Sequence, residues 1–244
     1  MTKKIRVGAV SYLNTKPLIY GFEQGMMKDK IELIFDYPAN IAAALLNDEI
    51  DLGLIPVAII PEMKNYHIVG NHCIGSEGDV ASVCIFSEVP IEQIETLLLD
   101  YQSRTSVKLA QILIKEFWKI NPILKTAGKD FQLEIKGTTA AVVIGDRALE
   151  QRKISPYVYD LGAAWKAHTG LPFVFAAWVS NKQLDEIFIN EFINVTEFSL
   201  QHIDEIVRIN PFKSFDLKKY YTQYLSYNLS DEKREGLKQF LNRL

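Results

Sequence analysis

The sequence predicts an α/β protein of two lobes, with the second lobe inserted into the first. Strand and helix patterns alternate over the first third of the chain, which is typical of βαβ units and a parallel sheet. Polar turns directly follow the buried strands. Two long apolar runs, at 80–87 and 172–179, bracket a block with its own strand and helix pattern. We interpret this block as an inserted domain that is tethered by two crossover strands.

The composition is that of an ordinary globular protein that can bury a sizeable core. Of the 244 residues, 48% are hydrophobic and 23% are charged, and the net charge is −3. Lysine and arginine are scattered along the chain and form no basic stripe, so we expect no nucleic-acid partner. No apolar run approaches the roughly 18 residues of a membrane span, so we expect no membrane contact.

The N-terminal segment and the cysteines predict a cytoplasmic protein. Lys3, Lys4 and Arg6 precede an apolar stretch that is too short for the hydrophobic region of an export signal. Cys73 and Cys84 form no CxxC pair, and we interpret both as reduced thiols.

The first apolar run, 5–10, breaks into a polar turn before Pro17, which predicts a buried strand, a turn and then a helix. In open α/β sheets, ligands bind at the carboxyl ends of strands, where unpaired N–H groups face a crevice. Ser11 and Asn14 are therefore the first candidate ligand contacts. In the alternative interpretation, Asn14 or Thr15 only caps the helix.

The next two strands of the first lobe are predicted at 31–35 and 51–57, with a helix at 41–46 between them. The strand at 51–57 should open on the same crevice, because parallel strands align their carboxyl ends. Farther along, Ser82 interrupts the apolar run at 80–87. It is either a hydrogen-bonded core serine or a second ligand contact.

In the inserted block, a predicted strand at 96–99 leads into hydroxyl side chains at the start of an amphipathic helix. This cluster consists of Ser103, Arg104, Thr105 and Ser106. The helix N-terminus favours an anion and the arginine adds a charge-assisted contact, so the cluster is a candidate carboxylate site. In the alternative interpretation, Ser103 only caps the helix.

The remainder of the block predicts a loop at 122–128 and strands at 131–135, 141–147 and 157–161. The strand at 141–147 reaches a turn at Gly145 and Asp146. Gly145 lets the backbone approach a ligand closely, and Asp146 either caps the next helix or faces the cleft. After the block, apolar residues recur at helical spacing from 184 to 207, and two short helices are predicted near Asp216 and Ser230.

Motifs for common catalytic groups are absent from the sequence. The four histidines show no metal-ligand spacing, and no GxGxxG, Walker A or GxSxG motif occurs. We therefore expect neither a metal nor a cofactor. The candidate cleft holds hydroxyls, an amide, an arginine and backbone N–H groups, which suit a small anion.

Two functions agree with such a cleft. A solute-binding module would close two lobes on a carboxylate, and an enzyme would use the same closure to keep a reactive substrate from water. A transport receptor must lie outside the membrane, so the missing export signal favours the enzyme.

Seven segments, spread over nearly the whole chain to about residue 210, match the motif order of one family. They are SYLNTKP at 11–17, DLGLIPV at 51–57, SV-x-x-FS at 82–87, SRTS at 103–106, GD-x-AL at 145–149, YDLG at 159–162 and TGLPFVFA-x-W at 169–178. Together they resemble the chorismate dehydratase family of the futalosine route to menaquinone.

The resemblance implies a type II periplasmic-binding-protein-like fold, with two α/β lobes joined by two crossover strands. Lobe one would comprise 1–86 and 175–244 with its C-terminal helices, and lobe two would comprise 87–174. The implied reaction removes water from chorismate and gives 3-[(1-carboxyvinyl)oxy]benzoate without a cofactor or metal. The sister enzyme of the pathway, 1,4-dihydroxy-6-naphthoate synthase, shares the fold but carries an SPCPNDT-like segment where this chain has SYLNTKP.

The resemblance also implies roles for the candidate residues. Asn14 would be the catalytic group near the departing hydroxyl, and Ser82 would be a second substrate contact. The cluster at 103–106 would seat a carboxylate, while Gly145 and Asp146 would line the opposite wall. No protein base is evident among these residues, so we expect the side-chain carboxylate of the substrate to act as the base.

Overall fold

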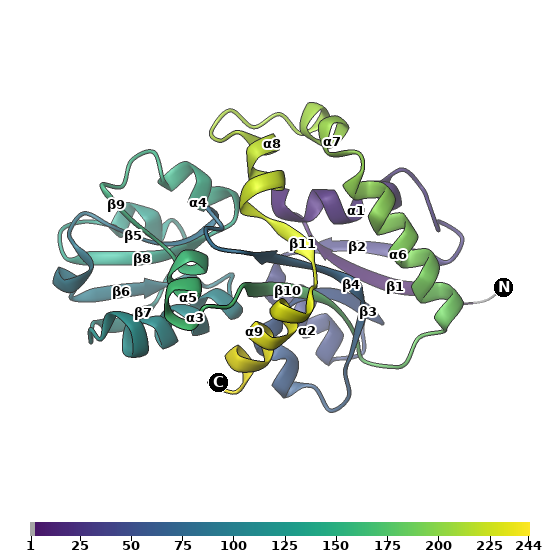
Figure 1. Cartoon of the computed structure of the whole chain (residues 1–244), viewed down its shortest axis with the longest axis horizontal. Coiled ribbons are helices and arrows are strands. Elements are labelled where there is room, and N and C mark those ends of the chain that lie inside the picture. Colours follow the sequence, from purple (N-terminus) through teal and green to yellow (C-terminus); the bar gives the residue numbers. More distant parts are fainter. Residues whose placement is uncertain (1–2) are drawn as a thin grey trace.

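The structure is a computed structural model that describes residues 3–244, and it has two α/β lobes, each built on one mixed sheet (Figure 1). In spatial order, the first sheet consists of β11 (Ser226–Asn228), β4 (His67–Ser76), β10 (Phe173–Ser180), β3 (Leu52–Pro56), β1 (Ile5–Val10) and β2 (Ile31–Asp36). Strand β1 pairs parallel with β2 and β3, whereas β10 pairs antiparallel with β3 and β4. The predicted architecture of two α/β lobes is confirmed.

The second sheet lies in the lobe drawn in teal at the left of Figure 1. In spatial order, it consists of β7 (Ile123–Thr126), β6 (Thr96–Leu99), β8 (Thr139–Ile144), β5 (Val83–Ser87) and β9 (Tyr157–Asp160). Strand β6 pairs parallel with β7 and β8, and β5 pairs antiparallel with β8 and β9.

Helices flank both sheets. The first lobe carries α1 (Lys16–Glu23), α2 (Pro38–Leu46), α6 (Glu186–Leu200), α7 (Ile203–Ile209), α8 (Leu217–Lys219) and α9 (Asp231–Leu241). The second lobe carries α3 (Thr105–Leu113), α4 (Asp146–Gln151) and α5 (Leu161–Thr169). Several begin at capped residues, since Asp185 and Ser230 accept first-turn N–H groups of α6 and α9. No helix within residues 3–244 is long and apolar enough to cross a membrane.

The chain passes between the lobes at 77–82 and again at 170–172. Strand β5 pairs along both edges with strands of the second sheet and therefore belongs to the second lobe. The first crossing lies before β5, whereas the sequence prediction placed the end of the first lobe after residue 86. Asp160 holds this crossing in place, because its carboxylate accepts the N–H groups of Val80 and Ala81 at 3.1 and 2.8 Å. Ala81 has a φ of +63°, and the turn at this residue directs the chain into the second lobe.

Two predictions in the second lobe are wrong. The stretch predicted as a strand at 131–135 forms a short 3-10 helix at Phe131–Glu134, which follows a left-handed turn at Asp130 with a φ of +56°. The ring of Phe131 is fully buried beneath the guanidinium of Arg147. The stretch predicted as a loop at 122–128 contains the edge strand β7.

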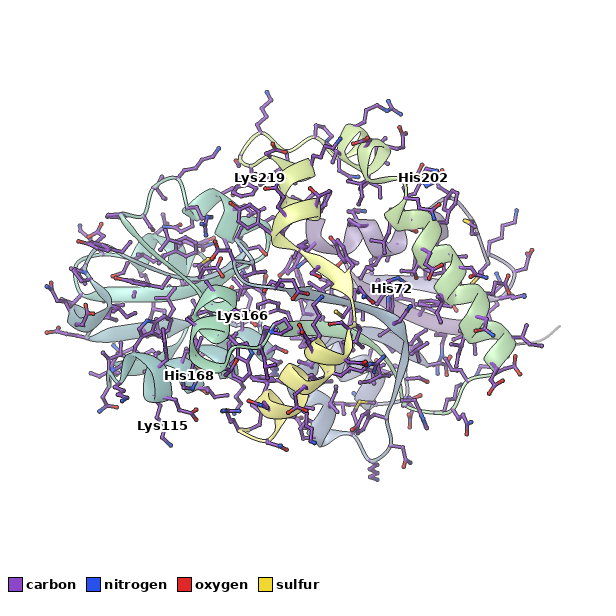
Figure 2. The ribbon with its side chains drawn as sticks, in the orientation of Figure 1. His72, Lys115, Lys166, His168, His202 and Lys219 are labelled. Carbon is purple, nitrogen blue, oxygen red and sulfur yellow. The ribbon has the colours of Figure 1, made fainter. Side chains whose placement is uncertain are left out.

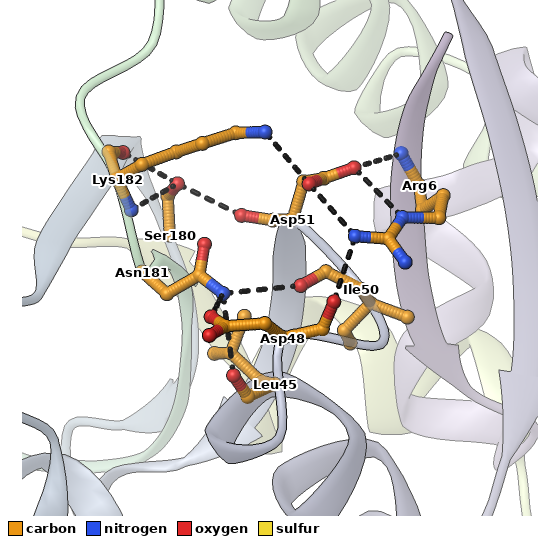
Figure 3. A network of polar contacts seen from close by, with 8 residues as sticks. All are labelled: Arg6, Leu45, Asp48, Ile50, Asp51, Ser180, Asn181 and Lys182. Atoms are coloured by element: carbon orange, nitrogen blue, oxygen red, sulfur yellow. Dashed lines mark hydrogen bonds and ion pairs between the residues drawn. The ribbon is translucent and has the colours of Figure 1, made fainter.

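A polar network closes the end of the first sheet that lies away from the strand carboxyl ends (Figure 3). Its centre is the buried Asp51, whose Oδ1 lies 3.0 Å from Nη2 of Arg6 and 2.7 Å from Nζ of Lys182. Burial alone raises the pKa of Asp51, but the hydrogen bonds from Arg6 and Lys182 outweigh it and hold the pKa well below its usual range. The network therefore ties together the start of β1, the start of β3 and the chain after β10.

Candidate active site

A cavity of about 60 Å³ lies between the lobes, at the carboxyl ends of the parallel strands. Both lobes contribute to it, and its apolar walls include Val10, Leu54, Ile74 and Phe175 from the first lobe and Val83 and Ile144 from the second. The polar side chains of its lining are Tyr12, Asn14, Ser103, Thr105 and Ser106. The crevice predicted at the strand ends therefore exists, and the second lobe forms part of its walls.

Asn14 lies in the short segment between β1 and α1. Residues Leu13–Thr15 form one turn of 3-10 helix, and Thr15 donates its hydroxyl to Asn14 Oδ1 at 3.3 Å. The phenol of Tyr227 donates to the backbone oxygen of Asn14 at 3.0 Å. Thr15, at the N-cap of α1, makes no capping hydrogen bond with its side chain. These contacts leave the Asn14 amide N–H groups as donors for a ligand.

The hydroxyl cluster lies at the start of α3, on the second-lobe side of the cavity. Ser103 Oγ accepts the N–H of Ser106 at 3.1 Å, so Ser103 binds the first turn of α3, as in the alternative interpretation, although the N-cap position itself is Arg104. Thr105 Oγ1 accepts the N–H of Ala58 at 3.1 Å, which links the two lobes. Each of these hydroxyls accepts a bond and retains its own O–H, and the helix N-terminus favours an anion. The cluster can therefore donate to a carboxylate in the cavity.

Gly145 follows β8, the neighbour of the strand that precedes the hydroxyl cluster, so it lines the cavity from the same lobe and not from an opposite wall. Its backbone has a conformation that suits only glycine. Its φ is +65° and its ψ is −148°, and an added Cβ would lie 3.1 Å from the ring of Tyr12. The N–H of Gly145 donates to the backbone oxygen of Ser82 at 2.8 Å. This turn brings the tyrosine ring of the first lobe directly against the backbone of the second.

Asp146 follows at the first position of α4 and faces the first lobe. Its Oδ1 accepts the backbone N–H of Leu13 at 3.2 Å. Burial raises the pKa of Asp146 to about 6, against the opposing effects of the Leu13 hydrogen bond and the Arg147 charge. Asp146 therefore bridges the lobes beside the cavity and is not part of its lining.

The structure brings five of the nine predicted site residues together around the cavity. They are Asn14, Ser103, Thr105, Ser106 and Gly145. The other four lie outside its lining. Ser11 and Arg104 are exposed, Asp146 contacts Leu13, and Ser82 is fully buried, with its Oγ accepting the O–H of Tyr220 at 2.7 Å.

A chain of polar side chains across the lobes was not predicted from the sequence. Tyr12 donates its O–H to Gln102 Oε1, which also accepts Nη2 of Arg147 at 2.8 Å. The same Nη2 lies 2.7 Å from Oδ2 of the buried Asp100. Burial raises the pKa of Tyr12, so its phenol is a donor at neutral pH. Tyr12 lies in the SYLNTKP segment, but its partners come from distant segments and no sequence pattern links them.

The histidines do not form a common site: His67 and His72 lie on β4, and the other two lie on other elements. Figure 2 shows His72 in the first lobe, His168 on α5 and His202 between α6 and α7. Among residues 3–244, no group of three His, Cys, Asp or Glu side chains is arranged to hold a metal ion.

Solved structures similar to this chain share its two-lobed fold. A protein from Archaeoglobus fulgidus aligns with a TM-score of 0.78 at 16% identity, over 98% of this chain and 96% of its own. A Candida albicans protein described as having the generic periplasmic binding protein structural fold aligns with a TM-score of 0.65 at 13% identity, over 98% of this chain and 89% of its own. The predicted periplasmic-binding-protein-like fold is therefore confirmed.

Two curated relatives are chorismate dehydratases. The protein from Thermus thermophilus is 22% identical over 98% of this chain and 94% of its own length. The protein from Campylobacter jejuni is 25% identical over 96% of this chain and 95% of its own length. A family model described as "Menaquinone biosynthesis" matches residues 5–244. Because this match spans nearly the whole chain, and the predicted resemblance points the same way, the chain belongs to the menaquinone biosynthesis family.

Proposed function

We propose that this protein is a chorismate dehydratase, a hydro-lyase that converts chorismate to 3-[(1-carboxyvinyl)oxy]benzoate and water. The observation that carries the proposal is the cavity between the lobes, whose polar lining consists of hydroxyl and amide donors. Such a lining suits a small dicarboxylate. Membership of the menaquinone biosynthesis family and similarity to two chorismate dehydratases over nearly the full chain support this choice of substrate.

The proposed dehydration needs only a few hydroxyl and amide side chains of the kind that line the cavity. Loss of the proton from the ring carbon that bears the enolpyruvyl ether gives an anion delocalised into the ring carboxylate. Departure of the neighbouring hydroxyl then forms the last ring double bond, and the proton and the hydroxyl leave as water. Because the product ring is aromatic, the substrate supplies much of the driving force. The protein has to orient it and stabilise the developing charge.

The residues of the cavity suit these tasks. We assign Asn14 to the departing hydroxyl, because its amide can donate to an oxygen that gains negative charge. We assign the cluster of Ser103, Thr105 and Ser106 to a carboxylate at the start of α3. Gly145 lies beside this cluster, where its backbone lines the cavity. In this proposal Ser82 contributes through its hydroxyl after the side chains around it have shifted, since it is fully buried in the structure.

In this proposal the side-chain carboxylate of chorismate removes the ring proton. An analogue in which an amide replaces that carboxylate should bind but should not turn over. Turnover of the analogue at the normal rate would contradict substrate-assisted proton removal.

Substrate entry requires the lobes to separate. Both lobes line the cavity, and two contacts between the lobes, Tyr12 with Gln102 and Leu13 with Asp146, lie beside it. The two short crossings at 77–82 and 170–172 supply the hinge. Closure would then exclude water and bring Asn14 to the substrate.

The decisive experiment uses the purified protein, treated with EDTA and supplied with chorismate alone. We expect an aromatic enolpyruvyl benzoate, identified by NMR and mass spectrometry, at a rate well above that of a heat-inactivated control. Cofactor independence, the futalosine route and a cytoplasmic location are parts of the same proposal, which metal add-back, product feeding and cell fractionation test separately. Tight binding of chorismate without turnover would instead indicate a non-catalytic anion-binding protein.

A further inference from the structure

We propose that Asp146 and Gln102 are positioning residues that fix the segment carrying Asn14 against the second lobe when the lobes close. This inference rests on the proposed function, because it assigns Asn14 to the reacting part of the substrate. It adds a role for two second-lobe side chains that lie outside the lining of the cavity.

The residues before Asn14 are held from the second lobe. The O–H of Tyr12 donates to Gln102 Oε1, and the N–H of Leu13 donates to Asp146 Oδ1 at 3.2 Å. The ring of Tyr12 also packs on Gly145. Within the first lobe, Tyr227 donates to the backbone oxygen of Asn14. The position of Asn14 therefore depends on hydrogen bonds from both lobes.

Gln102, the second-lobe partner of Tyr12, is itself held in place by hydrogen bonds within the second lobe. Gln102 Oε1 accepts Nη2 of Arg147 at 2.8 Å, and Arg147 pairs with Asp100. Asp100 is 1% exposed and also accepts the backbone N–H groups of Gln102 and Ile144 at 3.0 and 3.3 Å. Charge-assisted bonds in a buried setting are short and directional, so this group provides a rigid surface for Tyr12.

Asp146 acts through Leu13 and not through the substrate, because its carboxylate contacts the Leu13 N–H and lies outside the cavity lining. A displacement of about 1 Å in a catalytic group can lower a rate by roughly 100-fold. Two bonds to the residues before Asn14 therefore couple lobe closure to the placement of its amide.

The first test compares two substitutions of one residue. Asp146→Ala removes the acceptor, and we expect kcat to fall by roughly 10- to 100-fold while KM changes by less than about threefold. Asp146→Asn keeps an oxygen that can accept the Leu13 N–H, and its kcat should stay within about threefold of wild type. Glu150→Ala, an exposed acid on the same helix, is the matched control.

Two outcomes would overturn the inference. Equal loss of kcat in Asp146→Asn and Asp146→Ala would indicate that the carboxyl itself takes part in the reaction. A kcat for Asp146→Ala equal to that of the Glu150→Ala control would show that the contact with Leu13 has no role in positioning.

The second test needs no activity. Hydrogen exchange of the Leu13 amide, measured by NMR on the full chain, should be slow in wild type and in Asp146→Asn and at least tenfold faster in Asp146→Ala. Similar exchange in all three proteins would contradict the proposed docking. If wild-type protein fails to dehydrate chorismate, the proposed function fails, while this exchange pattern still tests the contact itself.

Discussion

The phenol of Tyr220 donates a hydrogen bond to Ser82 Oγ across 2.7 Å, and both side chains are excluded from solvent. Tyr220 belongs to the C-terminal segment, which lies at the junction of the lobes in yellow in Figure 1, and Ser82 lies at the end of the first crossing. Because the serine oxygen accepts from the tyrosine, the serine O–H is directed elsewhere. The tyrosine therefore sets the orientation of the hydroxyl that we propose as a substrate contact.

Ser82→Ala should lower kcat/KM by about tenfold, because the substrate loses a donor. Tyr220→Phe should lower it less and reduce the free energy of unfolding by about 1 kcal/mol, since it removes one buried hydrogen bond. Steady-state kinetics and urea denaturation measure both effects. Unchanged kcat/KM in Ser82→Ala would show that the pair is purely structural.

Asn14→Ala should lower kcat by about 100-fold with a much smaller rise in KM, because we assign its amide to charge that develops in the transition state. Asn210→Ala serves as the control, since Asn210 ends α7 and its amide contacts the backbone of Ile206. A rise in KM with unchanged kcat would make Asn14 a simple binding residue.

Gly145→Ala should lower kcat/KM by at least tenfold, because the new methyl group meets the ring of Tyr12 in a backbone conformation that costs a non-glycine residue about 1–3 kcal/mol. Gly137→Ala is the matched control. Gly137 also has a positive φ, +57°, but a Cβ added there would have no atom within 4 Å. Equal activity of the two variants would exclude the steric role of Gly145 in closure.

Asp146→Asn should raise the Tm at neutral pH. The folded-state pKa of Asp146, raised by burial to about 6, exceeds its unfolded value of about 3.9, so the buried carboxylate destabilises the fold above pH 6. As the pH falls from 6 to 4, the wild-type carboxyl takes up a proton and this penalty disappears. Thermal unfolding at pH 4–8 should show the largest Tm difference above pH 6.

The charged and titratable groups around Asp146 come from three parts of the chain. Arg147 and Glu150 lie on its own helix, Tyr12 faces it from the first lobe, and Tyr220 and Tyr221 face it from the C-terminal segment. Burial raises the pKa of all three tyrosines, so they stay neutral over this pH range.

Asp51→Asn should change the Tm at neutral pH in the direction opposite to that of Asp146→Asn. The pKa of Asp51 is held low, so its carboxylate stabilises the fold above its unfolded pKa of about 3.9 and loses this contribution as the pH falls through its folded value. The variant should therefore have a lower Tm at neutral pH with unchanged kcat. A Tm difference of the same sign in both variants would contradict the assigned environments.

Arg104→Glu should leave kcat/KM within about twofold at physiological ionic strength, because the side chain is exposed at the start of α3. At low salt, the reversed charge should reduce the association of an anionic substrate by a few-fold. Lys108→Glu on the same helix is the control. A loss above about tenfold at physiological salt would instead indicate direct contact with a substrate carboxylate.

Much of the first lobe was predictable because its strands are continuous apolar runs and its turns are polar. Strand β4 lacks that pattern, since its glycines interrupt it: the backbone at Gly70 has a φ of +75°, and Gly75 lies against the buried chain of Lys233. Strand β7 is exposed at a sheet edge and carries no buried face to produce a pattern. Such elements depend on their neighbours in the fold and not on local sequence.

The candidate site was predictable where a polar residue directly follows a buried strand, as at Asn14 and Ser103. It was not predictable where an apolar strand residue lines the cavity, as Phe175 does, because such a residue looks in the sequence like any other core residue. The contact of Tyr12 with Gln102 joins residues far apart in sequence, and only the docking of the two lobes brings them together.

The place of β10 in the first sheet has a consequence for how the protein is made. Its residues, 173–180, lie between β3 and β4, yet they are synthesised after every strand of the second sheet. As the nascent chain leaves the ribosome, the inserted lobe can complete its sheet while β3 and β4 still lack the strand that joins them. The middle of the polypeptide therefore matures before its N-terminal part, the reverse of the usual vectorial order.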